Sequence, residues 1–206
     1  KISHWVTTTT EALKKEYLQY NDNVYVIPNY VDPLDWDEPI KNETWKIRVW
    51  LVWSVTTNWD FKEAAESIKR LSENKDVQLV MFWLPPTKTS EKIKKLYKDD
   101  YDFWSSLNIE WQPLVEMEDY FETLRNLRLD IMMIPRKNDY FNKCKSNVKF
   151  LEASMLSIPC VCQSFEDWPY ENVIEDWVNW LMVKNNNDWY DKVISLVNNK
   201  ELREKI

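Results

Sequence analysis

Short apolar runs alternate with longer amphipathic stretches along this chain, and this alternation constrains the fold more than any other feature. Apolar runs without polar alternation are typical of parallel strands that are covered on both faces. Apolar residues at spacings of three and four predict amphipathic helices. Because strands and helices follow one another in turn, right-handed βαβ units are expected. The sequence therefore predicts an α/β protein with a doubly wound, Rossmann-like parallel sheet.

The predicted elements divide into two units. We expect strands at 24–28, 47–54, 77–84, 109–115, 129–135, 159–163 and 180–183. We expect helices over 61–71, 90–107, 117–127, 146–156 and 188–206. Asn58 or Asp60 is a candidate cap for the helix that contains 61–71. A linker-like stretch rich in Pro, Asp, Glu and Asn leads us to place residues 1–40 in one unit and residues 41–206 in the main domain.

Charge and composition exclude several classes of protein. A net charge of −7 argues against nucleic acid as a partner, because binding it requires a basic surface. No run approaches the ~18–20 apolar residues of a membrane span, and the first residues do not have the pattern of a signal peptide. The three cysteines lack zinc-site spacing, and reduced thiols in a cytoplasmic protein are the simplest interpretation.

The chain contains no glycine and thirteen tryptophans. At the usual share of ~7%, about 14 glycines would be expected. Several tryptophans stand where a predicted strand meets a turn, and such places often need a positive φ or a close backbone approach that glycine provides at low cost. We hypothesise that these tryptophans occupy positions that are glycines in a parent sequence. Trp53 and Trp180 are then expected to have a positive φ or little side-chain room.

The segment 142–159 follows a predicted strand and opens a helix. A helix start carries free backbone N–H groups and a partial positive charge, which suit a phosphate. Lys145, Ser146 and Lys149 add two cations and a hydroxyl there. Glu152 lies one turn beyond Lys149, where its carboxylate can accept hydrogen bonds from ribose hydroxyls. The alternative is a surface ion pair between Lys149 and Glu152 on a capped helix.

Several motifs together resemble one family. Residues 145–164 and 169–183 resemble the signature of group 1 (family 4) glycosyltransferases of the GT-B fold. Residues 176–183 are similar to the D-G-x-N-G-L tail of that signature, with tryptophan at both glycines. Residues 24–32 resemble the junction between the two domains of the family, and residues 47–54 resemble the first strand and glycine loop of the second domain.

The resemblance implies the C-terminal half of a GT-B enzyme. Residues 41–206 would be the nucleotide-sugar-binding domain, and residues 1–40 the junction segment. The implied reaction is the retaining transfer of a sugar from a nucleoside diphosphate sugar to a glycan or lipid-linked acceptor, as in polysaccharide biosynthesis. The donor is then a substrate, and neither a cofactor nor a metal is required. The N-terminal domain would bind the acceptor and supply any catalytic base, so this half is expected to hold no catalytic residue and to be inactive alone. Peripheral membrane association is an option for the full-length enzyme.

The resemblance also assigns site residues. Glu152 corresponds to the second glutamate of the E-x7-E motif, which contacts the ribose, whereas the first glutamate falls at Cys144. The segment instead resembles a subgroup with N-x-x-K-S-x-x-K-x-x-E, in which Lys145, Ser146 and Lys149 approach the diphosphate. Arg136 is a candidate for phosphate or sugar contact, with a solvated loop arginine as the alternative. The residues expected to face the donor from the first loop are Ser54, Val55 and Thr56.

The sequence leaves open two functions other than donor binding in a glycosyltransferase. A non-catalytic α/β interaction module with a degenerate donor site is favoured if indoles line the loop near Ser54. A GT-B-like sugar-nucleotide epimerase would rely on histidines, but His4 is the only histidine in the chain. The lone histidine also argues against a Ser–His–Asp triad and against a zinc site built from several histidines.

Overall fold

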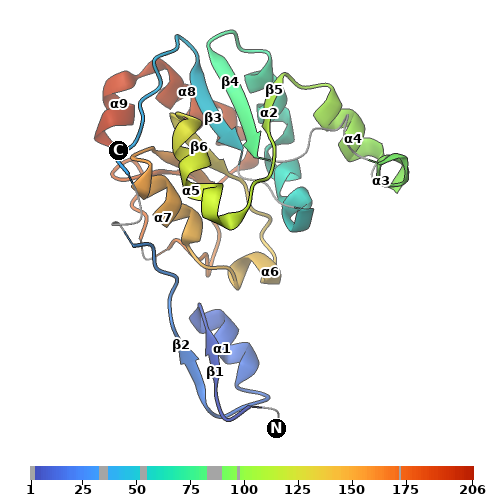
Figure 1. Ribbon diagram of the computed structural model, residues 1–206, viewed down its shortest axis with the longest axis vertical. Helices are drawn as coiled ribbons and strands as arrows, with labels where there is room; N and C mark the ends of the chain where they lie inside the picture. The colour runs from blue at the N-terminus through green and yellow to red at the C-terminus, as the bar shows by residue number, and fades with distance from the viewer. Residues whose placement is uncertain (1–2, 33–36, 52–54, 83–89, 97, 172) are drawn as a thin grey trace.

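The computed structural model describes residues 3–32, 37–51, 55–82, 90–96, 98–171 and 173–206 (Figure 1). These residues form a small two-stranded sheet near the N-terminus and a six-stranded sheet that carries most of the chain. The pairing between neighbouring strands is parallel in both sheets.

The six-stranded sheet has the doubly wound topology that the sequence predicts. Its strands are β3 (Ile47–Leu51), β4 (Val77–Phe82), β5 (Ile109–Gln112), β6 (Ile131–Ile134), β7 (Cys160–Gln163) and β8 (Leu181–Val183). Their order in the sheet is β5-β4-β3-β6-β7-β8. The chain thus winds outward in one direction from β3 and in the other direction from β6, which is the classic Rossmann order. The predicted fold class is confirmed.

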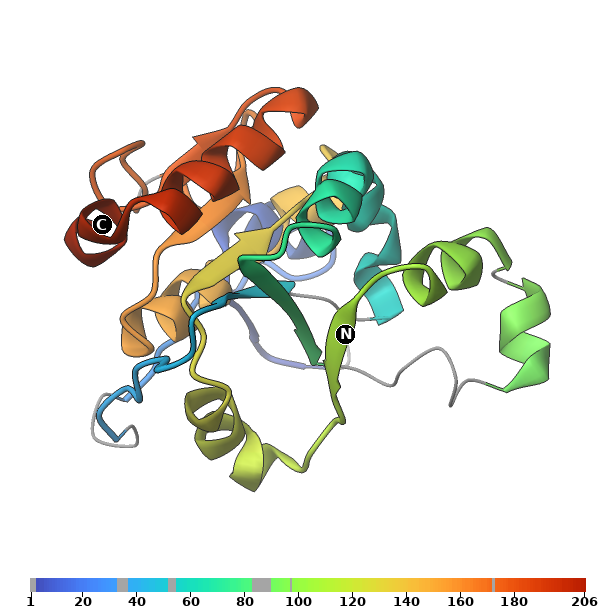
Figure 2. The ribbon, with the colours of Figure 1, turned by 90° about the horizontal axis from the view of Figure 1, so that it is seen from above.

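Helices cover both faces of this sheet (Figure 2). One face packs against α2 (Ala65–Ser72), α4 (Lys98–Ser105) and α8 (Trp189–Asn198) through a cluster that includes Ile68, Trp104 and Val193. The other face packs against α5 (Met117–Asn126) and α7 (Val148–Met155) through a cluster that includes Leu124 and Ala153. The remaining helical elements of the main domain are η2 (Val55–Ala64), α3 (Glu91–Leu96), α6 (Tyr140–Lys143), η4 (Asn186–Asp188) and α9 (Lys200–Lys205). None of the described helices is long and apolar enough to cross a membrane.

The first residues form a separate β–α–β unit that lies beside the start of α6 and α7 (Figure 1). It consists of β1 (Val6–Thr8), α1 (Glu11–Tyr17) and β2 (Val24–Val26), with the Thr10 side chain capping α1. Hydrogen bonds between described residues join this unit to the main domain, and one of them links Glu16 to Tyr140. The Thr10 hydroxyl donates to the Cys144 carbonyl at 3.0 Å, and the Asn29 amide donates to the Ser146 hydroxyl at 2.5 Å.

Three predicted helices differ from the observed ones. The prediction that Asn58 or Asp60 caps the helix after β3 is wrong, because residues 55–64 form a 3-10 segment and α2 starts only after Ala64. The predicted helix 90–107 is present as α3 and α4, with Tyr97 outside the described residues. The predicted helix 188–206 is divided at Asn199, whose extended backbone lets its side chain cap α9.

The tryptophans give a divided result. The expectation for Trp180 is wrong, since its φ is not positive and its buried indole packs 4.7 Å from the Phe150 ring. Trp53 lies outside the described residues. Trp177 does have a positive φ, of 64°, which is a strained conformation for a bulky residue. Trp180 therefore fills space in the core, whereas Trp177 occupies a backbone position that favours glycine.

Candidate donor-binding site

The predicted site lies at the carboxyl ends of the strands, at the point where the winding direction reverses. β3 and β6 are neighbours in the sheet, and the chain leaves them toward opposite faces. In open α/β sheets, ligands bind in the crevice outside the carboxyl ends at such a point. The connection after β3 leads into η2, and the connection after β6 leads through Arg136 to α6 and α7.

A buried ion pair joins these two connections. Arg136 Nη1 lies 3.0 Å from Asp60 Oδ2, and both side chains are less than a tenth exposed. Asp60 Oδ1 also accepts from the backbone N–H of Lys137 at 2.9 Å and from the Asn142 side-chain amide at 2.7 Å. One carboxylate thus accepts three hydrogen bonds and ties the loop after β6 to the segment after β3. The arginine is held in place by these contacts, so the interpretation of Arg136 as a solvated loop residue is wrong.

Lys145 is a partly buried cation close to Arg136. Its amino group lies 4.5 Å from the centre of the Phe141 ring. Burial and, after it, the nearby Arg136 guanidinium lower the pKa of Lys145 to about 8. Beside it, the Asn142 Oδ1 atom is buried and has no hydrogen-bond partner among the described residues. A lysine that is partly desolvated next to an arginine is stabilised in its charged form by an anion.

Lys149, Glu152 and Tyr120 form a second cluster, between α7 and α5. Lys149 Nζ donates to Glu152 Oε2 at 2.6 Å and to the Tyr120 hydroxyl at 3.1 Å. The Tyr120 hydroxyl donates in turn to Glu152 Oε2 at 3.3 Å. The Glu152 side chain is 7% exposed and that of Lys149 is 21% exposed, so the alternative of a surface ion pair is wrong. Burial, followed by the Glu152 carboxylate, raises the pKa of Tyr120 well above its usual value, which keeps its hydroxyl protonated.

Tyr120 and Asp60 were missed as site residues at the level of sequence. The sequence places Tyr120 within the predicted helix 117–127 and does not show that its hydroxyl is buried, where a tyrosine hydroxyl usually needs a partner. Asp60 was considered only as a helix cap. The hydrogen-bond partners of Tyr120 and Asp60 in the site are between 29 and 82 positions away from them along the chain.

The start of α7 faces the small N-terminal unit. The helix begins at Val148, and the preceding residue Asn147 makes no side-chain capping bond. Ser146 and Lys145 are partly exposed at this end, and Ser146 accepts the hydrogen bond from Asn29. The start of α7, which has no side-chain cap, therefore lies next to residues of the N-terminal unit. This is the position for which the sequence predicts a diphosphate.

The remaining predicted residues fall where the structure gives less detail. Ser54 lies outside the described residues. Val55 and Thr56 begin η2, so their backbone leaves the carboxyl end of β3, but their side chains lie outside the described part. Within the described part, no group of three or more His, Cys, Asp or Glu side chains is arranged to hold a metal ion. The ligand-binding roles of Lys145, Ser146, Lys149, Glu152 and Arg136 stay predictions.

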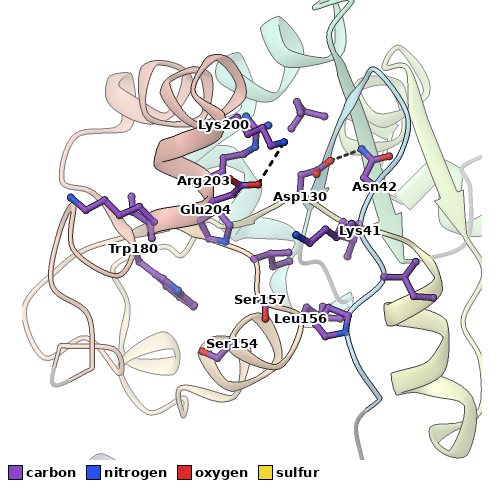
Figure 3. Close-up of a pocket in the computed structure, with 18 of the residues that line it drawn as sticks. Lys41, Asn42, Asp130, Ser154, Leu156, Ser157, Trp180, Lys200, Arg203 and Glu204 are labelled. Carbon is purple, nitrogen blue, oxygen red and sulfur yellow. Dashed lines mark hydrogen bonds and ion pairs between the residues drawn. The ribbon is translucent and has the colours of Figure 1, made fainter.

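The cavity drawn in Figure 3 lies at the other end of the sheet. Its volume is about 1010 Å³, and its walls include Asp130 and Pro159, which precede β6 and β7. Asp130 is held by the Asn42 amide at 2.6 Å, and Glu204 pairs with Lys200 at 3.7 Å. Trp180 is buried in the wall, so its ring face is not free to stack on a ligand. None of the predicted donor-site residues lines this cavity.

The fold and the position of the site define a class of protein. The same doubly wound order of parallel strands is found in the C-terminal domain of GT-B glycosyltransferases, and solved structures of such proteins are similar to this chain. The C-terminal domain of LpcC, a group 1 glycosyltransferase from Francisella tularensis, matches with a TM-score of 0.57 and 18% identity. That match covers 86% of this chain and 92% of LpcC's domain.

Two longer enzymes were solved with nucleotides. S. aureus TarM, in complex with UDP, fondaparinux and α-GlcNAc-glycerol, matches with a TM-score of 0.65 and 20% identity over 98% of this chain. HepE from Anabaena, in complex with UDP-glucose, matches with a TM-score of 0.67 and 9% identity over 98% of this chain. This chain spans 38% of the length of TarM and 56% of that of HepE. No family model and no curated protein matches the sequence. The chain therefore has the fold of a GT-B C-terminal domain.

Proposed function

We propose that this chain is the donor-binding domain of a retaining glycosyltransferase that transfers a sugar from a nucleoside diphosphate sugar. The observation that carries the proposal is the pairing of two clusters at the switch point. One is cationic and contains Arg136 and Lys145; the other contains the carboxylate of Glu152. A diphosphate would bind beside Lys145 and the uncapped start of α7, and the ribose would bind at Glu152. The UDP and UDP-glucose complexes of the similar proteins support uracil as the base of the donor.

Chemically, this arrangement suits the departure of a nucleoside diphosphate. Negative charge develops on the diphosphate as the bond to the sugar breaks. Lys145, Lys149 and the N–H groups at the start of α7 would stabilise that charge more strongly in the transition state than in the ground state. These cations would replace a metal in this role, so the proposed reaction needs no cofactor. Transfer itself would require an acceptor and a base from a further domain.

The N-terminal unit supports the proposal of a further, acceptor-binding domain. A two-stranded sheet is marginal on its own and normally belongs to a larger one. The large side chains of this unit are unusually exposed, with Trp5 at 67%, Tyr20 at 72% and Tyr30 at 77%. Large apolar side chains that lie side by side on a surface commonly mark a contact surface. We place the acceptor, a glycan or a lipid-linked saccharide, on that second domain, and the fragment alone is expected to have no transferase activity.

Titration calorimetry with UDP, GDP and dTDP tests the donor site directly. UDP is expected to bind with a dissociation constant below about 1 mM. Replacing Lys145 with methionine removes one charge-assisted contact to the diphosphate, so UDP affinity should fall by about tenfold or more. Lys143→Met is the matched control, because the Lys143 amino group pairs with Asp167 instead, and it should change the affinity less than about twofold. The proposal is overturned if none of the three nucleotides binds at millimolar concentration.

The pKa of Lys145 predicts the pH dependence of this binding. The free protein loses the Lys145 proton as the pH rises through about 8, and a bound diphosphate favours the protonated form. UDP affinity should therefore fall as the pH rises, by about tenfold between pH 7 and pH 9 if only protonated Lys145 binds. The terminal phosphate titrates near ~6 and does not contribute over this range. In Lys145→Arg the charge persists at pH 9, so the dependence should disappear; a wild-type profile that is flat from pH 7 to 9 contradicts the prediction.

A further inference from the structure

The Tyr120 hydroxyl contacts both charged side chains of the second cluster, Lys149 and Glu152, which also contact each other. Tyr120 is on the second turn of α5, while Lys149 and Glu152 are on α7. Its ring makes edge contacts with Phe82 at 5.6 Å and with Phe121 at 5.4 Å between ring centres. These contacts fix the plane of the ring and hence the place of its hydroxyl. The hydroxyl is therefore positioned by the packing of α5 against the sheet, independently of α7.

The direction of each hydrogen bond in this cluster is determined by chemistry. A lysine ammonium has three donors and no acceptor, so Lys149 donates both to the Tyr120 hydroxyl and to Glu152. The Tyr120 hydroxyl, whose oxygen accepts from Lys149, uses its single proton for Glu152. Among the described residues, both hydrogen bonds to the Glu152 carboxylate end on Oε2. Oε1 is thus the oxygen available to accept from a ligand.

Two donors from different helices hold this carboxylate more firmly than one. Lys149 is three residues before Glu152 on the same helix. If this ion pair were the only contact, both side chains could change conformation together and the carboxylate would not keep one orientation. Tyr120 adds a contact from α5 and fixes Oε2 against rotation. The Lys149 amino group also lies 5.4 Å from the Trp50 ring centre and 5.7 Å from that of Tyr120, which restricts its own movement. Removing the Tyr120 hydroxyl would leave the cluster packed but the carboxylate less well oriented.

We propose that Tyr120 is a positioning residue for ribose recognition. By holding Oε2 of Glu152, it directs Oε1 to the hydroxyls of the ribose. The site then selects ribonucleoside diphosphates over 2′-deoxyribonucleoside diphosphates. The inference rests on the proposed function, because it assumes that the nucleotide of the donor binds at Glu152. It adds a residue and a specificity that the resemblance does not supply. The position of the hydroxyl, not the bulk of the ring, is the property that matters.

Tyr120→Phe tests this with two ligands that differ in one atom, UDP and 2′-deoxyuridine diphosphate. The wild-type protein should bind UDP about tenfold more tightly than the deoxy ligand, since a hydrogen bond to a carboxylate is lost. In Tyr120→Phe, UDP affinity should fall by about fivefold to tenfold while affinity for the deoxy ligand changes less than about twofold. The ratio of the two affinities should approach one. Loss of packing alone would weaken both ligands equally and leave the ratio unchanged.

Two further variants make the result decisive. Tyr190→Phe is the matched control, because Tyr190 packs under Arg70 on the other face of the sheet, and it should keep the wild-type ratio. Glu152→Gln removes the group through which Tyr120 acts, so adding Tyr120→Phe to it should not change the ratio further. Equal weakening of both ligands in Tyr120→Phe overturns the inference, as does a wild-type protein that binds both ligands equally. A wild-type protein that binds neither ligand overturns the proposed function itself.

Discussion

Replacing Asp60 with alanine is expected to lower the free energy of unfolding by about 3–5 kcal/mol, the usual cost of breaking a buried ion pair by removing one partner. The Asp60 carboxylate is the acceptor for Arg136, for the Lys137 backbone and for Asn142. Without it, the Arg136 guanidinium remains buried without its partner charge. Urea unfolding followed by circular dichroism measures the loss.

Two variants separate this mechanism from a general effect of losing a carboxylate. Asp102→Ala breaks the exposed Lys98–Asp102 pair and should leave the free energy of unfolding nearly unchanged. Asp60→Ala combined with Arg136→Met removes both buried charges, so it should be more stable than Asp60→Ala alone. A loss below about 1 kcal/mol for Asp60→Ala, or no recovery in the double variant, would show that the pair does not hold the two loops together.

Trp177 and Trp180 are expected to respond in opposite ways when glycine and alanine replace them. At Trp177, whose φ is 64°, the glycine variant should be more stable than the alanine variant by about 1 kcal/mol, because a Cβ is strained there. At Trp180 the alanine variant should be the more stable, by up to about 1 kcal/mol. Both variants at Trp180 should also lose about 3–5 kcal/mol relative to the parent, since they leave a cavity beside Phe150 and Tyr170.

Thermal and urea unfolding of the four variants measure these differences. The glycine–alanine comparison is made within one position, so the loss of the indole cancels. Both variants at Trp177 lose the contact between its ring and the Lys192 amino group, at 4.2 Å, so this loss also cancels in the comparison. Glycine and alanine variants of equal stability at Trp177 would remove the argument that this position favours glycine. A tolerated glycine at Trp180 would restore the original expectation for it.

The parallel sheet and the positions of its strands were largely predictable, because the apolar pattern of a strand is a local property. The apolar runs at 49–51 and 131–134 are buried in the sheet, and continuous apolar runs of this kind are typical of central parallel strands. Helix boundaries were less predictable. Asp60 has the chemistry of a cap, yet the energy of pairing with Arg136 outweighs that of capping a helix. Asn199 shows the reverse case, in which one local cap divides a helix that the apolar pattern continues.

The candidate site was predictable only where its residues are close in sequence. Lys145, Ser146, Lys149 and Glu152 share one helix start, so their spacing placed them together. Spacing could not reveal that Tyr120 reaches Glu152 from another helix. Nor could it reveal that Arg136 is neutralised by an acid 76 positions earlier in the chain.

The sequence by itself determined the α/β class, the parallel sheet and the helix start near residue 146, because periodicity and helix-end chemistry act over a few residues. Tertiary structure alone decided which side chains are buried and which carboxylate pairs with each cation. It also decided which tryptophan packs in the core and which one has a strained backbone. The reason is physical: burial and ion pairing depend on distances between segments, and folding sets those distances only when the sheet and its helices are assembled.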